Sequence, residues 1–306
     1  MFKGYLREHP AIFQLSVFVG IWSTLQLITY LLLPKMISFL YGQNTSGIAG
    51  DGLSTQQEID AYMMINGISS FLCFVLPPIL FASVAAPKVM PYLEIKKDHL
   101  RRIALAVCLG IGMVLVFPIL GHWINLANWG EAAKENMQQL IERNNAIFSD
   151  PDFSSLLRNL IVMALLPAIG EELFFRGMVQ RFANSWLRNP RNAIIFTSLF
   201  FAFIHLQIVN FLPIFLASCL LGYIFHTTGN LLITIIVHFV YNSIQILLRY
   251  TPQNNENQNF EYIILFVIGL LISACCWYLF RRYQSPLSKN WGVHEPGESQ
   301  GNKAIN

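Results

Sequence analysis

Charged side chains are scarce in this chain. Asp, Glu, Lys and Arg together make up 12% of its 306 residues, whereas soluble domains carry about 25%. Hydrophobic residues make up 54%, so the polar side chains are too few to cover a folded surface in water. This scarcity excludes an ordinary soluble globule and favours a protein whose main solvent is lipid.

Two further absences narrow the class of protein. No polar segment combines a basic patch with interleaved aromatic residues, so the sequence gives no support for nucleic-acid binding. No cysteine falls in a polar loop, where an extracellular disulfide would lie. The five cysteines, Cys73, Cys108, Cys219, Cys275 and Cys276, all stand in apolar runs. We expect them to pack in the core or against lipid.

Long apolar runs predict an all-α integral membrane protein, a polytopic bundle of about eight transmembrane helices. The predicted spans are residues 11–33, 62–86, 103–121, 157–180, 192–209, 211–227, 230–249 and 261–280. Only a few residues separate the fifth run from the sixth, so one bent or re-entrant element there would reduce the count to seven. The first run lacks a following cleavage site, and we expect it to remain as an anchor.

The runs also divide the chain into four predicted parts. Residues 1–154 hold about three N-terminal spans with an extracytoplasmic loop, and residues 155–250 hold the spans that carry the polar motifs. Residues 251–284 contain the last span. Residues 285–306 are rich in Gly, Ser, Asn and Pro, a composition that predicts a disordered tail.

Loop charges predict the orientation in the membrane. Lys and Arg cluster before the first span, between the second and third, after the fourth and after the last, and such clusters mark the cytoplasmic side. The loops at 43–60 and 122–156 are mainly acidic. We therefore expect a multi-pass protein of the cell membrane with both termini cytoplasmic, typical of the bacterial inner membrane. Residues 131–148 have helical periodicity, which fits a surface helix over the outer mouth or a solvated connector helix.

Ionisable residues inside the predicted spans are few and fall in one third of the chain. A charge at mid-bilayer costs about 3 kcal/mol on insertion scales, so such residues are functional candidates. Away from the span ends they are Glu171, Glu172 and Arg176 in the fourth span, His205 in the fifth and His238 in the seventh, while His226 stands at the inner end of the sixth.

The fourth span places two carboxylates side by side. Glu172 and Arg176 are four residues apart, so an internal ion pair is predicted. Glu171 points about 100° away from Glu172, which leaves it available for chemistry. Pro167 and Gly170 predict a local kink beside these carboxylates. In the alternative interpretation, the three charges only neutralise one another or reach an interface.

The two histidines each have a partner one helical turn away. Phe201 precedes His205, and Asn242 follows His238 on the same helix face. Imidazole, carboxylate and amide groups suit hydrolysis, in which a base takes a proton from water and donors stabilise an oxyanion. Proton-coupled transporters also use Glu and His within the bilayer, so the residue types alone leave that alternative open.

Together these residues resemble a known family. Three motifs in chain order, EExxxR from Glu171, FxxxH ending at His205 and HxxxN from His238, resemble those of the CPBP intramembrane proteases. That family includes eukaryotic CAAX prenyl proteases of the Rce1 type and bacterial Abi-type immunity proteins. The resemblance covers residues 155–250 and implies a helical membrane fold with a catalytic cavity open to the cytosol.

The resemblance also implies a role for each motif residue. Glu171 would be the general base and His205 would help to hold the attacking water, while His238 and Asn242 would stabilise the oxyanion. Glu172 and Arg176 would support the site.

A metal is an open question at this stage, because Glu171, His205 and His238 could form a three-ligand zinc set. The chain nevertheless lacks the HExxH spacing of many zinc proteases, so the cofactor is either zinc or none.

The predicted function is therefore an intramembrane endopeptidase that hydrolyses a peptide bond of a membrane-associated protein or peptide. Its partners would be this substrate and membrane lipid, and no nucleic acid. The alternatives are a non-enzymatic membrane scaffold or bacteriocin-immunity-type protein, and a proton-coupled transporter.

Overall fold

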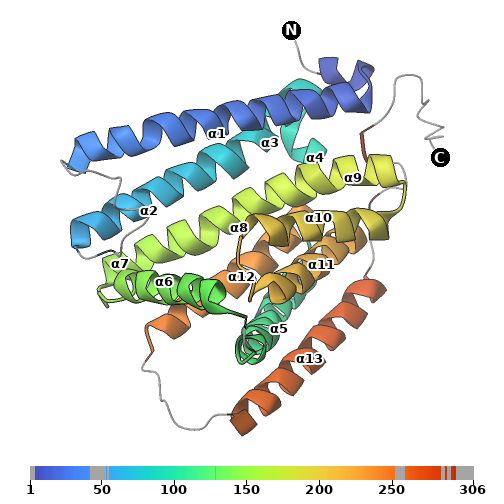
Figure 1. Cartoon of the computed structure of the whole chain (residues 1–306). Coiled ribbons are helices and arrows are strands. Elements are labelled where there is room, and N and C mark those ends of the chain that lie inside the picture. Colours follow the sequence, from blue (N-terminus) through green and yellow to red (C-terminus); the bar gives the residue numbers. More distant parts are fainter. Residues whose placement is uncertain are drawn as a thin grey trace.

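The computed structural model describes residues 4–41, 53, 55–127, 129–251, 259–283, 287 and 291–293. Every regular element in these ranges is a helix (Figure 1). In chain order they are η1 (Tyr5–Glu8), α1 (Ala11–Tyr41), α2 (Gln56–Ser70), η2 (Phe71–Val75), α3 (Leu76–Ala85), α4 (Val89–Tyr92), α5 (Leu100–Asn125), α6 (Glu131–Ile147), α7 (Phe153–Asn159), η3 (Leu160–Leu165), α8 (Leu166–Glu171), η4 (Glu172–Val179), α9 (Gln180–Leu187), α10 (Pro190–Ile204), α11 (Phe211–Thr228), α12 (Leu231–Arg249) and α13 (Asn259–Arg282).

Within the described residues, seven helices are long and apolar enough to cross a membrane. They are α1, α2 to α3, α5, α7 to α9, α11, α12 and α13. The predicted all-α polytopic bundle is therefore confirmed. The fifth predicted run forms α10, which has 15 residues and reaches about 22 Å at 1.5 Å per residue. It is a separate helix from α11, so the fifth and sixth runs are not one bent element.

Two of the long helices contain π-helical segments just before prolines. The segment η2 ends two residues before Pro77 and Pro78, and η3 ends two residues before Pro167. Proline lacks the N–H group that an α-helix needs at that position, and a local change in hydrogen-bond spacing accommodates the loss. The irregularity expected near Pro167 therefore takes this form.

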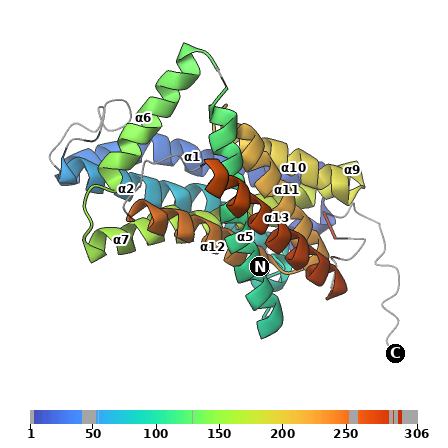
Figure 2. The ribbon, with the colours of Figure 1, turned by 90° about the horizontal axis from the view of Figure 1, so that it is seen from below.

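The helices form a bundle whose two ends are chemically different. In Figure 1 helices α1, α2, α8, α9 and α10 run across the view, and η1 and the C-terminal end of α9 lie at the right-hand end. Figure 2 shows α5 and α13 crossing this layer at one side, with α6 standing out from the bundle. Helix α5 packs against α12 and α13, and α10 packs against α9 and α11. The basic loops before α5 and after α9 lie at the end that holds η1.

Backbone hydrogen bonds join segments at this basic end. The Gly4 amide donates to the Val84 carbonyl, and the Leu231 amide donates to the Glu94 carbonyl. Each bond links two segments that loop charge assigns to the same side. The fold is therefore consistent with the predicted topology, and the orientation in the bilayer stays a prediction.

The disordered tail predicted from residue 285 stays a prediction, but the few tail residues that the structure describes pack against the bundle. Leu287, Trp291 and Val293 are buried against the core. The Asn184 side chain donates to the Trp291 carbonyl at 2.6 Å, and the Val293 amide donates to the Ser185 hydroxyl at 2.6 Å. Three apolar side chains among polar neighbours are enough to fix this segment. Residues 284–286, 288–290 and 294–306 lie outside the described residues.

The structure describes the predicted outer loop at 122–156 more fully than the one at 43–60. Residues 42–52 and 54 lie outside the described part, so most of the loop at 43–60 stays a prediction. The helix expected at 131–148 is present as α6. It is amphipathic, burying Ala133 and Ile147 while most other side chains are exposed or half-buried, and it faces the loop of residues 205–210.

Candidate active site

A cavity of about 540 Å³ lies inside the bundle between α2, α5, α8, α10, α11 and α12. Glu171, His205, His238 and Asn242, the four residues predicted to be catalytic, all line it. They come from two separate helices, α8 and α12, and from the end of α10, so the fold gathers groups that are up to 71 residues apart in sequence. The remaining lining is mostly apolar or aromatic, which suits a site for an apolar or peptide ligand.

His238 stands between the two neighbouring glutamates. Its Nδ1–H donates to Oε1 of Glu172 at 3.0 Å, and its Nε2 lies 3.9 Å from Oε2 of Glu171. A histidine that donates from one ring nitrogen to a carboxylate keeps the other nitrogen free to act. The bond to Glu172 therefore directs Nε2 of His238 towards Glu171 and the cavity.

The two glutamates lie in different environments, as the helical period predicts. Glu172 and Arg176 are fully buried and form an ion pair, with Nη1 of Arg176 at 3.0 Å from Oε1 of Glu172. The Glu171 side chain is 19% exposed and lines the cavity. One carboxylate is thus held by a buried cation, while the other faces the space that a ligand would occupy.

Arg176 ties three helices together beneath the site. Its Nη2 donates to the carbonyl and hydroxyl oxygens of Ser218 on α11, at 3.1 and 3.0 Å. Its guanidinium also lies 5.1 Å from the ring centroid of Phe201 on α10. These contacts hold Glu172, and through it His238, in a fixed position relative to the cavity.

His205 lies where α10 ends, beside a strained residue. Its Nδ1–H donates to the Phe201 carbonyl at 2.7 Å, which leaves Nε2 as the acceptor. The next residue, Leu206, has φ of 52°, a left-handed conformation that costs a non-glycine residue about 1–3 kcal/mol. Such strain concentrates at functional sites. The aromatic ring of Phe201 lies 4.6 Å from the His205 ring and 6.4 Å from the His238 ring, centroid to centroid.

The structure resolves an apparent mismatch in depth between Glu171 and His205. Counted from the ends of the predicted spans, they lie about 10 and 20 Å from the cytoplasmic face. In the structure the fourth span continues to Leu187, and α10 begins three residues later at Pro190. Counted from that shared turn, Glu171 and His205 are 16 and 15 residues away, and so they lie at the same level.

The proposed zinc set is not brought together. No group of three or more His, Cys, Asp or Glu side chains in the described residues is placed to hold one metal ion. Glu171, His205 and His238 line one cavity but do not form a three-ligand cluster. The donor geometry does not fit a metal centre, so no step below is assigned to a metal.

Sequence reasoning missed several polar residues that also line the cavity. Tyr62 and Asn66 reach it from α2, Tyr241 from α12 and Gln207 from the loop after His205. Tyr241 and Gln207 stand within two residues of predicted site residues, and this proximity was the only available signal. No signal in the sequence singled out Tyr62 or Asn66, because their helix carries no motif.

Comparison with known proteins gives a family for part of the chain. Residues 153–244 match the family model "Type II CAAX prenyl endopeptidase Rce1-like". The matched stretch contains all of the motif residues discussed above. The resemblance read from the motifs is therefore confirmed for residues 153–244.

One curated protein is similar to part of this chain. The uncharacterized protein YpbD of Bacillus subtilis (strain 168) is 27% identical over 121 residues, which cover 39% of this chain and 59% of YpbD. The match thus spans less than two thirds of the relative. No solved structure matches the chain.

Proposed function

We propose that this chain, a multi-pass membrane protein whose residues 153–244 match the Rce1-like family model, is an intramembrane endopeptidase. Its substrate would be a membrane-associated protein or peptide that enters the cavity of about 540 Å³. The observation that carries the proposal is the position of His238, which is bound to buried Glu172 through Nδ1 and faces Glu171 through Nε2.

Each site residue has a role that its surroundings support. Glu171 is the half-buried carboxylate on the cavity wall, so it acts as the general base that takes a proton from water. His205, at the same level across the α9–α10 hairpin, helps to hold that water. Asn242 donates to the oxyanion of the tetrahedral intermediate from its side-chain amide, and His238, one turn away on α12, donates from Nε2 when that nitrogen carries a proton as well as Nδ1.

In this reaction the water oxygen forms a bond to the carbonyl carbon of the peptide while its proton passes to Glu171. The carbon–nitrogen bond then breaks, and the amine leaves with a proton returned by the carboxyl group of Glu171. The buried Glu172 and Arg176 pair takes no part in this transfer and keeps His238 oriented. The cytosol-facing opening of the cavity stays a prediction from the family resemblance.

Replacement of Glu171 tests the proposal. Comparative membrane proteomics of cells with the wild type and with Glu171→Gln identifies proteins whose cleavage depends on the carboxylate. The identified segment, as a quenched fluorescent peptide, is then assayed with purified protein in proteoliposomes. Loss of the general base lowers kcat by about 10² to 10⁴-fold.

Glu261→Gln provides the matched control, because Glu261 is exposed in the first turn of α13. This variant retains wild-type activity. Undiminished cleavage by Glu171→Gln, or full complementation of a deletion strain by it, contradicts the proposal and favours a non-enzymatic role.

A further inference from the structure

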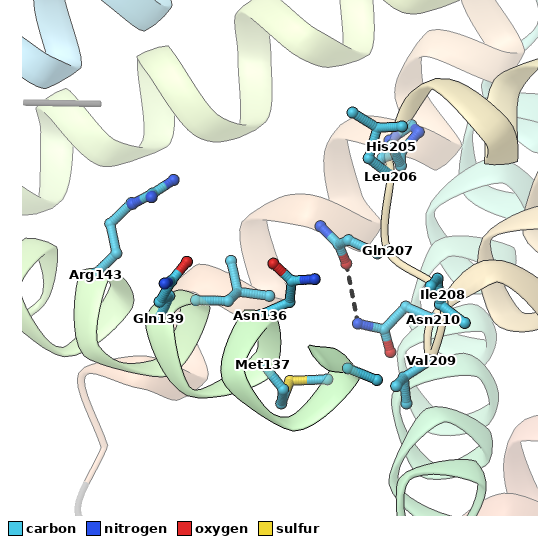
Figure 3. Close-up of a pocket in the computed structure, with 12 residues that line it drawn as sticks. Asn136, Met137, Gln139, Arg143, His205, Leu206, Gln207, Ile208, Val209 and Asn210 are labelled. Carbon is cyan, nitrogen blue, oxygen red and sulfur yellow. Dashed lines mark hydrogen bonds between the residues drawn. The ribbon is translucent and has the colours of Figure 1, made fainter. Parts of the chain in front are cut away.

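A second cavity of about 220 Å³ lies beside the active-site cavity, between α6 and the loop of residues 205–210 (Figure 3). We refer to it as the side compartment. Its volume is far above the roughly 15 Å³ that a single water molecule requires. In Figure 3 Asn136, Gln139 and Arg143 approach it from α6, and Gln207 and Asn210 approach it from the loop.

Half of the residues that line the side compartment are polar, and one of them carries a positive charge. Arg143 is its one cation, four side chains are amides, and none of the described lining residues is Asp or Glu. Asn210 donates to the side-chain oxygen of Gln207 at 2.9 Å, which orients the Gln207 amide. Its nitrogen then faces the α6 side in Figure 3. Donors from both walls therefore converge on the space.

Among the residues that the structure describes, no acidic side chain pairs with Arg143. Its guanidinium lies 5.5 Å from the ring centroid of Tyr62. Stacking on an aromatic face leaves the N–H groups at the edge of a guanidinium available to a planar anion. The side compartment thus holds a cation whose hydrogen-bond donors are not used by another charge.

The side compartment is continuous with the active site through shared residues. His205 and Gln207 line both cavities, and Tyr62, beneath Arg143, lines the larger one. The loop that separates them is irregular backbone at the level of Glu171, and in membrane proteins such backbone is tolerated where it lines a cavity. A peptide held at Glu171 and His205 can therefore extend into the side compartment.

We propose that the side compartment is a subsite that binds a carboxylate of the peptide, with Arg143 as the residue that selects it. The proposal rests on the peptidase function proposed above. A carboxylate fits a guanidinium by charge-assisted, bidentate hydrogen bonds, and the amides of Gln139 and Gln207 can supply further donors. The carboxylate is either the C-terminal group of the peptide or an Asp or Glu side chain.

A binding experiment tests this subsite without any catalytic step. Trifluoroacetyl-Ala-Ala, as the free acid and as the C-terminal amide, is titrated against the purified Glu171→Gln protein in detergent micelles and followed by fluorine NMR line width. The acid binds at least about tenfold more tightly than the amide, as a charge-assisted hydrogen bond predicts. Trifluoroacetyl-Glu amide and trifluoroacetyl-Gln amide form a second pair, which shows whether a side-chain carboxylate is accepted.

Variants of Arg143 assign the effect to the side compartment. Arg143→Gln abolishes the preference for the acid, while Arg143→Lys retains part of it because the charge remains. Arg249→Gln is the matched control, since Arg249 is an exposed cation at the end of α12 and does not line the compartment. This control keeps the full preference.

A kinetic experiment then links the subsite to cleavage. For a reporter peptide with the selected carboxylate, Arg143→Gln raises KM about tenfold. For the same peptide with that group amidated, the variant matches the wild type. Equal loss on both peptides, or no acid preference in the wild type, overturns the carboxylate subsite. Failure of the proposed peptidase has a different signature, because binding by Glu171→Gln retains the acid preference while the wild type cleaves nothing.

Discussion

At the scale of single residues, the site depends on a histidine placed between two unequal carboxylates. His238 is hydrogen-bonded to buried Glu172 and faces half-buried Glu171. Because Arg176 also binds Glu172, one buried carboxylate oxygen serves both a cation and an imidazole. We interpret Glu172 as a positioning residue that keeps Nε2 of His238 aimed at the cavity.

Charge balance and positioning at Glu172 can be separated by two variants. Glu172→Gln leaves Arg176 as an uncompensated buried charge, which costs about 3–5 kcal/mol of stability, and it also lowers kcat. The double variant Glu172→Gln, Arg176→Met removes both charges, and replacing a whole buried pair is often nearly neutral for stability. We expect the double variant to regain its melting temperature in micelles without regaining kcat.

Recovery of both properties in the double variant would show that Glu172 acts only through its charge. Recovery of neither would indicate that the Arg176 contacts to Ser218 carry the local structure.

The sequence predicted much of this site but not its hydrogen bonds. The burial cost of charge singled out Glu171, Glu172, Arg176, His205 and His238, and helical spacing correctly paired Glu172 with Arg176. The bond from His238 to Glu172 joins two helices 66 residues apart, and no helical period reports such a contact. Only the packing of α12 against the fourth span creates it.

At the scale of helices, hydropathy misplaced the end of the fourth span. The apolar run stops near residue 180, whereas the helix continues to Leu187 through Gln180, Arg181 and Asn184. These polar residues are covered by other segments, since Arg181 lies between the rings of Tyr92 and Trp291, at 3.9 and 5.2 Å from their centroids. The first polar residues of this stretch set the predicted end of the membrane span near residue 180, but the helix itself ends at Leu187.

Close packing of α5 depends on glycines that hydropathy also ignores. A Cβ atom added to Gly269 on α13 would lie 2.6 Å from Cβ of Leu115 and 3.0 Å from the Gly112 carbonyl oxygen. Without a hydrophobic driving force between helices in lipid, such small residues allow the backbone contact that holds helices together.

We therefore expect Gly269→Ala to destabilise the bundle by about 1–3 kcal/mol through overpacking. Gly20→Ala on α1 is the matched control, because nothing lies within 4 Å of its added Cβ; it is neutral or stabilising, as alanine favours helices. Thermal unfolding of both variants in micelles provides the comparison, and equal melting temperatures would contradict the packing argument.

At the scale of the whole molecule, alternating basic and acidic loops predicted which helix ends lie together. The structure brings the segments before α5, after α9 and after α11 to one end of the bundle. The number of spans was less predictable, because α10 has the composition of a membrane helix but only 15 residues. Helix α10 ends at Ile204 because the loop that follows it, residues 205–210, lines a cavity. The apolar content of the run does not reveal this end.

The orientation is tested with protease-sensitive tags in bacterial membrane vesicles. A tag at either terminus is cleaved only in inside-out vesicles, and a tag inserted in the loop at 43–60 is cleaved only in right-side-out vesicles. This follows from the excess of Lys and Arg in loops at the end that holds η1. Cleavage of the two terminal tags from opposite sides would contradict the prediction that both termini are cytoplasmic.

The buried tail has a practical meaning for anyone preparing the protein. A polar C-terminus after the last membrane helix invites removal for crystallisation or cryo-microscopy, and a cut after Tyr283 looks harmless from composition. That cut would strip the indole of Trp291 from Arg181 and the hydrogen-bond partners from Asn184 and Ser185. Shortened versions would therefore be damaged at the C-terminal end of α9, and an inactive preparation could be mistaken for an inactive protein.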